Sequence, residues 1–212
     1  MSFYWVKTNQ LIKKIFGNYY WDLPNQIKSI YLTFDDGPTP EITDWVLDLL
    51  KDQNIKATFF CIGKNIQANP LLFERIKKEG HSIGNHTFNH VNGWKTKNKQ
   101  YINNVEICEC LLDNKNNVSK LFRPPYGKLT RSQSKILRNK GYKIIMWDVL
   151  SADFDTTIAP EQCLNNVIST VQSGSIIVFH DSVKAATNMQ HALPKVIRFL
   201  KDNGYTFGTI PK

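Results

Sequence analysis

The chain alternates short apolar runs with longer amphipathic stretches along most of its 212 residues. Short runs bounded by turn residues are typical of strands, and apolar positions that recur every three or four residues are typical of helices. This pattern predicts seven strands, at residues 27–34, 56–62, 81–85, 121–122, 142–147, 175–179 and 205–210. The stretches between them predict helices at 39–53, 70–80, 97–113, 130–140, 160–172 and 189–202.

Strands that alternate with helices at short spacing predict an α/β fold with a parallel sheet, either open or closed into a barrel. Residues 26–212 contain no linker and are expected to form one domain. Composition agrees, because 42% hydrophobic and 21% charged residues are typical of a globular chain.

The first 25 residues differ from the rest, because they combine aromatic residues with a short apolar stripe beside two lysines. We expect a helical segment that packs on the barrel and closes its bottom; the alternative is peripheral contact of residues 1–21 with a membrane or cell wall. No export signal or membrane span is visible, so the cytoplasm is the default location. The stripe consists of Leu11, Ile12, Ile15 and Phe16, beside Lys13 and Lys14.

The net charge of +9 comes from scattered lysines and arginines. Without an aromatic and basic recognition motif, it indicates a solvated surface, and we expect no nucleic-acid partner. The cysteines form no Cys-x-x-Cys pair and are expected to be small buried side chains; they are Cys61, Cys108, Cys110 and Cys163.

Candidate chemistry begins where the first strand ends, at Asp35 and Asp36, followed by Gly37 and Pro38. Two adjacent anions at the end of a core strand repel each other and lose hydration, so a cation is expected nearby. The two side chains leave the strand in different directions, which allows one to bind a metal and the other to accept a proton. The alternative is an ordinary Asp-Gly-Pro turn.

A metal site is indicated by His86 and His90, because imidazoles four residues apart on a helical turn share one face. Asp36 adds an oxygen ligand. Zn²⁺ is the first expectation for such a hydrolytic set, although Co²⁺, Ni²⁺, Mn²⁺ or iron(II) would also suit these ligands. His81 is a competing ligand, but it begins a strand and is expected at the other end of the fold.

Further polar residues follow other strands, so the active site is expected at the C-terminal rim of the sheet. Arg123 is fixed by two prolines, and Asp35 is the carboxylate available to pair with it. His180 ends an apolar strand, and Asp153 follows the predicted fifth strand. A solvent-facing loop arginine and a core histidine are the structural alternatives.

Together these segments resemble the five motifs of the polysaccharide deacetylase family (carbohydrate esterase family 4, the NodB homology domain). The resemblance covers about residues 28–210 and implies a distorted (β/α) barrel. It also implies metal-dependent removal of N-acetyl groups from N-acetylglucosamine-type sugars in peptidoglycan, chitin or related glycans. The motifs are Thr33-Phe34-Asp35-Asp36-Gly37, His86-Thr87-Phe88-Asn89-His90, Arg123-Pro124-Pro125-Tyr126, Asp153-Phe154 and Val178-Phe179-His180.

The resemblance also implies roles for individual residues. Asp36, His86 and His90 would hold the metal; Asp35 would be the general base, oriented by Arg123; His180 would be the general acid, tuned by Asp153. The backbone N–H of Tyr126 would bind the oxyanion, and Phe154 and Val178, where the family often has tryptophan and leucine, would shape the acyl pocket. Trp94 is expected in the core, with sugar stacking as the alternative.

Other functions remain open from the sequence. The same site suits an O-acetyl esterase on xylan-type chains or an amidohydrolase on a small cyclic amide, and a sugar-binding protein without turnover is the alternative outside enzymes. The expected partner is an N-acetylated glycan, and the chain is expected to act as a monomer. A wall polymer as substrate would place it at the cell envelope.

Overall fold

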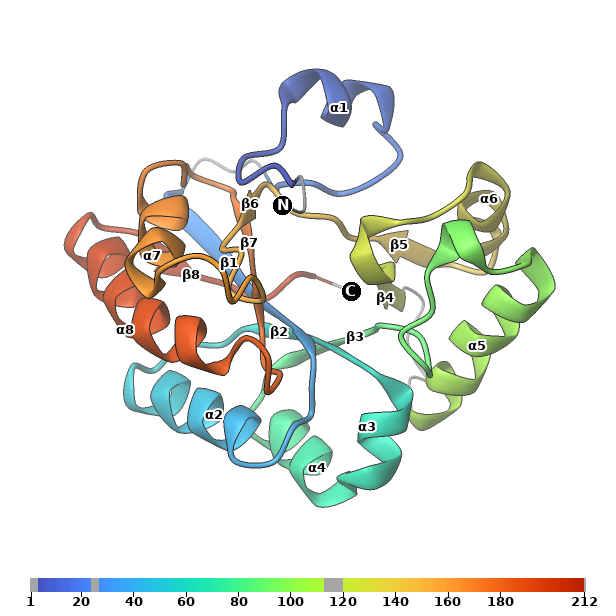
Figure 1. The fold of residues 1–212 in the computed structure, drawn as a ribbon, viewed down its shortest axis with the longest axis horizontal. Coiled ribbons are helices and arrows are strands. Elements are labelled where there is room, and N and C mark those ends of the chain that lie inside the picture. The colour runs from blue at the N-terminus through green and yellow to red at the C-terminus, as the bar shows by residue number, and fades with distance from the viewer. Residues whose placement is uncertain (1–3, 24–26, 113–119, 212) are drawn as a thin grey trace.

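The computed structural model describes residues 4–23, 27–112 and 120–211. Its strands form one parallel sheet in the order β5-β4-β3-β2-β1-β7-β6, with β8 paired to β1. The sheet curls into an incomplete barrel, and helices surround it (Figure 1). The strands are β1 Ser29–Asp36, β2 Thr58–Cys61, β3 Ser82–Asn85, β4 Lys120–Phe122, β5 Tyr142–Ile144, β6 Val149–Leu150, β7 Ile176–His180 and β8 Thr206–Phe207.

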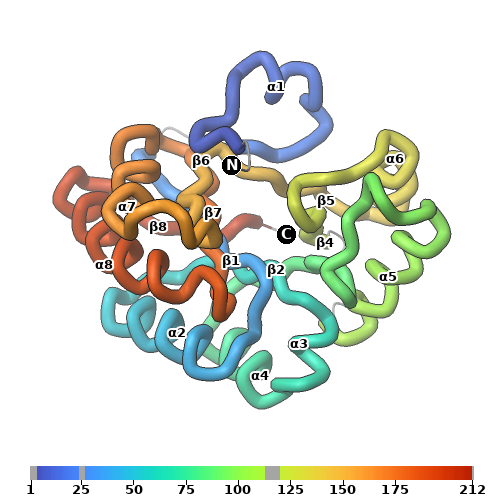
Figure 2. Tube along the Cα trace, in the orientation of Figure 1, coloured from blue at the N-terminus to red at the C-terminus, as the bar shows by residue number. Residues whose placement is uncertain are grey.

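The helices follow the strands at short intervals, and the tube view shows them as an outer ring (Figure 2). They bury apolar faces against the sheet, with the largest core cluster between α2, α8 and the strands β1, β2 and β7. The predicted barrel of parallel strands is confirmed. The helices are α1 Gln10–Ile15, α2 Ile42–Asp52, α3 Gly63–Ala68, α4 Pro70–Lys78, α5 Asn98–Leu111, α6 Arg131–Asn139, α7 Pro160–Ile168 and α8 Ala186–Asp202, with 3₁₀ turns η1 Gly93–Lys95 and η2 Pro125–Gly127.

Several predicted boundaries were wrong. Strand 142–147 ends at Ile144, and the two-residue β6 follows it. The short α3 was not predicted. The helix expected from residue 39 begins at Ile42, because Glu41 is its N-cap and exchanges capping contacts with Asp44. The polar stretch Asn114-Lys115-Asn116-Asn117, which predicts a turn, lies outside the described residues.

The N-terminal segment fills the gap in the barrel between β5 and β6. Its backbone pairs at Lys7 with Val149 on one side and at Tyr20 with Ile145 on the other, and Figure 1 shows α1 beside this gap. It therefore closes the side of the barrel rather than the bottom.

The helix α1 leaves most of its apolar stripe exposed, although Ile12 packs, partly buried, against the core. Leu11 and Ile15 are 63% and 59% exposed, whereas Lys13 is buried. The Lys13 ammonium lies 2.5 Å from a carboxylate oxygen of the fully buried Asp148, whose other oxygen lies 2.5 Å from the Lys7 ammonium. The buried charge turns this face of the helix inward, so the core prediction was wrong for Leu11 and Ile15, whereas Ile12 does contact the core. Membrane contact remains a prediction.

The burial of the cysteines was predicted correctly with one exception. Cys61, Cys108 and Cys163 are buried thiols, but Cys110 is exposed. Within residues 4–23, 27–112 and 120–211, every helix is too short or too polar to cross a membrane.

Candidate active site

The site is built on the last two residues of β1, Asp35 and Asp36, whose side chains leave the strand on opposite faces. Asp35 is 3% exposed and stands in register with His180 of the neighbouring β7. Asp36 has a left-handed backbone, with φ of 87°, at the point where the strand ends. The two carboxylates therefore join different clusters.

Asp35 is held by Arg123, which follows β4 and is completely buried. One guanidinium nitrogen, Nη1, donates to Asp35 Oδ1 and to Thr33 Oγ1, both at 2.7 Å, and Nη2 donates to the Met146 carbonyl at 2.9 Å. Burial alone would raise the pKa of Asp35, but the positive charge of Arg123 lowers the pKa below its usual value. The carboxylate is therefore ionised and fixed in direction.

The second carboxylate, Asp36, lies beside two imidazoles. Its Oδ1 is 3.7 Å from His86 Nε2 and 3.3 Å from His90 Nε2, and all three ligand atoms lie within 4.8 Å of one another. Oδ1 is buried and has no hydrogen-bond partner among the described residues. A buried carboxylate oxygen without a donor is costly unless a cation binds it.

Both imidazoles are suited to bind a metal. His86 Nδ1 lies 2.8 Å from the Arg123 carbonyl, which can only accept, so Nδ1 carries the proton and Nε2 keeps its lone pair toward Asp36. Burial lowers the pKa of His86 to about 4 and also lowers that of His90. Two neutral imidazoles and one free carboxylate oxygen fit a divalent cation of the zinc type.

The histidines come from a loop and not from the helical turn that their spacing predicted. Thr87 and His90 have positive φ angles of 64° and 53°. Asparagine side chains hold this loop, because Asn85 Oδ1 accepts the Thr87 N–H at 2.9 Å and Asn104 Oδ1 accepts the Phe88 N–H at 2.8 Å. The resulting turn brings the two imidazole centroids to 5.1 Å.

His180, the last residue of β7, is paired with Asp153. Asp153 Oδ1 lies 2.7 Å from His180 Nδ1, and Oδ2 accepts the His180 backbone N–H at 2.7 Å. Burial would lower the pKa of His180, but the Asp153 charge and hydrogen bond raise it to about 9. His180 is therefore protonated at neutral pH, and its Nε2–H is free of Asp153.

Aromatic side chains border these groups. The Phe154 and His180 rings meet edge to face with their centroids 5.2 Å apart, and the Tyr126 and His90 ring centroids are 4.6 Å apart. Tyr126 is 59% exposed and has a φ of 60°. Val178 is buried beneath the site, two residues before His180 on the same face of β7.

The structure thus brings together the two predicted clusters, one that could hold a metal and one of paired acid–base groups, at the C-terminal ends of the strands. Asp153 follows β6, not the predicted fifth strand, since that strand is shorter than expected.

The sequence matches a family profile described as polysaccharide deacetylase over residues 22–145, more than half of the chain. The chain belongs to the polysaccharide deacetylase family. The profile and the related proteins name a deacetylase activity, so the enzyme class predicted from the motifs is confirmed.

This deacetylase resembles characterised proteins along nearly its whole length. It is 36% identical over 197 residues to a peptidoglycan-N-acetylglucosamine deacetylase of Bacillus cereus, with 90% of each chain covered. A crystal structure of a peptidoglycan N-acetylglucosamine deacetylase bound to 4-naphthalen-1-yl-N-oxidanyl-benzamide superposes with a TM-score of 0.87 at 34% identity, covering 96% of this chain and 95% of that one.

Some members of the family are not active. A pseudoenzyme from Bacillus anthracis superposes on the deacetylase with a TM-score of 0.79 at 25% identity, covering 90% of this chain and 66% of that chain. The fold alone therefore does not establish turnover, which depends on the individual side chains of the site.

Sequence reasoning missed one polar residue of the deacetylase, Asp181, which directly follows His180. Its buried carboxylate accepts the Gly37 N–H at 3.0 Å and the Thr43 hydroxyl at 2.6 Å, and burial raises its pKa to about 7. A Cβ on Gly37 would lie 1.9 Å from Asp181 Oδ2. Asp181 thus shapes the turn after Asp36, and an acid following a strand-end histidine was the available signal.

Two other predictions can be compared with the structure. His81 is buried away from the metal cluster and accepts the Ala57 N–H on Nδ1 at 3.1 Å, which agrees with its exclusion as a ligand. Trp94 was expected in the core, but it is 66% exposed, with its indole N–H donating to the Leu129 carbonyl at 3.2 Å.

Proposed function

We propose that this polysaccharide deacetylase removes N-acetyl groups from N-acetylglucosamine-type sugars of peptidoglycan or a similar glycan. The observation that carries the proposal is the free, buried Asp36 oxygen facing two neutral imidazoles, beside the Asp35–Arg123 and His180–Asp153 pairs. The related peptidoglycan deacetylases support the choice of substrate.

Asp36, His86 and His90 would hold the metal, and we propose Zn²⁺ because two imidazoles and one carboxylate leave an open position in its preferred coordination. A divalent cation at this place supplies a Lewis acid that polarises a carbonyl and lowers the pKa of water to roughly 7. The Arg123 carbonyl keeps His86 in the required tautomer.

Asp35 would act as the general base. Arg123 lowers its pKa, so the carboxylate is unprotonated at neutral pH and available as an acceptor, and its contact with the guanidinium fixes its direction. Burial keeps other water away from this oxygen, which strengthens the interaction with a substrate water.

His180 would act as the general acid that protonates the departing amine. Its pKa of about 9 keeps the proton on the ring at neutral pH, and the Asp153 carboxylate holds Nδ1 so that Nε2–H is the donor. The backbone N–H of Tyr126 would donate to the oxyanion, and Phe154 and Val178 would border the acyl group. The ring of Tyr4, in the N-terminal segment, packs edge to face against the Phe154 ring, with their centroids 5.6 Å apart.

All residues with a proposed catalytic role come from residues 26–212 of one chain, which we take as the catalytic domain, and we take the protein to act as a monomer. In this chain Asp35 is paired with Arg123 and His180 with Asp153, as the proposed reaction requires.

Product analysis tests the function. The zinc-loaded protein is incubated with chitohexaose, peptidoglycan glycan strands and acetylated xylan, and both acetate and free amine are measured. The proposal predicts equal amounts of acetate and amine from the first two substrates. Acetate from xylan alone would show an O-acetyl esterase, and no acetate from any substrate would contradict the proposed activity.

A further inference from the structure

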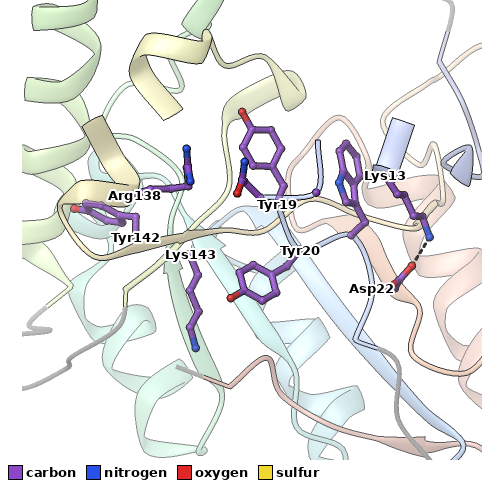
Figure 3. A pocket seen from close by; sticks show the side chains of 10 residues that line it. Lys13, Tyr19, Tyr20, Asp22, Arg138, Tyr142 and Lys143 are labelled. Atoms are coloured by element: carbon purple, nitrogen blue, oxygen red, sulfur yellow. Dashed lines mark hydrogen bonds and ion pairs between the residues drawn. The ribbon is translucent and has the colours of Figure 1, made fainter. Parts of the chain in front are cut away.

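A pocket of about 570 Å³ lies between the N-terminal segment and the junction of α6 with β5 (Figure 3). Beside it is a second hollow of about 310 Å³, which shares Asn18, Tyr19 and Arg138 with the first. We call the surface lined by these two adjoining hollows the α6 groove. None of the residues with a proposed catalytic role lines it.

The α6 groove is strongly basic. Arg131, Lys135 and Arg138 line it from α6, at a spacing that places them along one side of the helix, and Lys143 lines it from β5. In the part of the chain that the structure describes, the three α6 cations have no ion-pair partner. Among the described residues, the Lys143 ammonium has no carboxylate partner and donates to the Pro211 carbonyl at 3.4 Å.

The acidic side of the groove is already neutralised. The one acid among the lining residues is Asp22, and it is paired with Lys13, which also contacts the buried Asp148. The positive charge of Arg138 and Lys143 is therefore left for a ligand, and guanidinium and ammonium groups favour carboxylate or phosphate oxygens.

Tyrosine side chains face these cations. Figure 3 shows Tyr19 and Tyr20 on one side of the pocket and Arg138, Tyr142 and Lys143 on the other. Tyr20 is 40% exposed although its backbone is fixed by pairing with Ile145. An exposed ring on a fixed backbone offers a flat apolar face at little entropic cost, which suits a sugar ring.

The basic side of α6 connects this groove with the catalytic rim. Arg131 begins α6 four residues after η2, the turn that carries Tyr126 against His90. Arg138 lies seven residues further, about 10 Å along the helix axis. Tyr142, at the start of β5, places the far end of the groove toward the N-terminal ends of the strands. A chain molecule is therefore a better fit than a single sugar.

We propose that the α6 groove is a second binding site, which takes an anionic glycan chain by pairing its carboxylate or phosphate groups with Arg138 and Lys143 and stacking a sugar on Tyr20. The choice of a glycan as ligand rests on the proposed function. The site would hold a polymer on the enzyme while a distant sugar occupies the catalytic centre.

Equilibrium binding to three probes tests this proposal: carboxylate-bearing peptidoglycan glycan strands freed of peptide, phosphomannan, and neutral chitohexaose. The variants are Arg138→Gln/Lys143→Gln and Tyr20→Ala. The matched control is Lys51→Gln/Lys78→Gln, which removes the same charge from exposed lysines of α2 and α4. Binding is measured at low and high salt.

The proposal predicts that Arg138→Gln/Lys143→Gln weakens binding of an anionic probe about tenfold at low salt, that Tyr20→Ala weakens it as well, and that the control changes it less than twofold. Deacetylation of chitohexaose should be unchanged in all three variants. The anionic probe that binds more tightly identifies the group recognised, carboxylate or phosphate.

Equal weakening in the groove variant and the control, or no weakening in either, would overturn the proposal. The outcome is separate from that of the proposed function. If the protein releases no acetate but the groove variant loses binding, the deacetylase activity is rejected and the second binding site is kept. If the protein releases acetate and the groove variant binds as well as the native protein, the activity is kept and the second site is rejected.

Discussion

A single carboxylate, that of Asp153, contacts both the ring and the backbone of His180, with its two oxygens at 2.7 Å from Nδ1 and from the main-chain nitrogen. The carboxylate is fully buried, whereas the histidine side chain is 16% exposed. The pair therefore fixes the orientation of the ring and its protonation together, while leaving one edge of the imidazole accessible.

This pair predicts how activity depends on pH. Since the pKa of His180 is raised to about 9, the ring is protonated below that pH and loses its proton above it, so kcat/KM should fall on the alkaline side near pH 9. In Asp153→Asn the raising charge is gone and the burial that lowers the pKa remains, so the alkaline limb should move to lower pH. An unshifted limb in this variant would show that another group sets it.

Asp35→Asn tests the general base. The amide keeps the size of the side chain but cannot accept the proton, so kcat/KM should fall by about 100- to 10,000-fold. Zinc content should stay unchanged, because Asp36, His86 and His90 are untouched. Asp52→Asn, on the exposed end of α2, is the control and should retain activity. Full activity in Asp35→Asn would contradict the mechanism.

Asp148→Ala should release the N-terminal segment. Asp148 is fully buried and receives the Lys7 and Lys13 ammonium groups and the Ser175 hydroxyl, each at 2.5 Å. Removing it leaves Lys13 without this buried partner, so we expect the free energy of unfolding to fall by about 3–5 kcal/mol. Urea unfolding measures the loss, and limited proteolysis should cut before residue 23. Stability equal to that of Asp52→Ala would show that Asp148 does not hold the segment.

Trp94→Ala should affect binding of long substrates. The indole is 66% exposed, and the Lys128 ammonium lies 5.3 Å from its ring. If the ring stacks on a sugar, KM for chitohexaose should rise about 3- to 10-fold with little change in kcat, while a disaccharide is unaffected. Equal KM changes for long and short substrates would place the effect elsewhere. Stability should be nearly unchanged, because little of the ring is buried.

Much of the site could be predicted because its residues stand where apolar runs end. Asp35, Asp36 and His180 terminate strands, and the arrangement of parallel strands then places them at one rim. Pairing of Arg123 with Asp35 followed from the need of a buried guanidinium for a carboxylate, and the structure shows that contact at 2.7 Å.

The parts that were missed depend on tertiary contacts. The strand β6 is two residues long and exists because Val149 and Leu150 pair with β7, which no local pattern reveals. The inward direction of Lys13 depends on Asp148, which is 135 residues away in sequence. The histidine loop was taken for a helical turn because asparagine contacts from α5 and β3 determine its shape.

The proposed catalysis depends on the metal cluster, and zinc titration of metal-free protein by calorimetry tests this dependence most directly. The comparison includes Asp36→Ala and the control His191→Gln, which removes a partly exposed histidine of α8 that is not part of the metal cluster. We predict one equivalent of zinc for the native protein and the control, no high-affinity zinc for Asp36→Ala, and acetate release that rises in proportion to zinc bound. Stoichiometric zinc binding by Asp36→Ala, or full acetate release by the metal-free protein, would contradict the account.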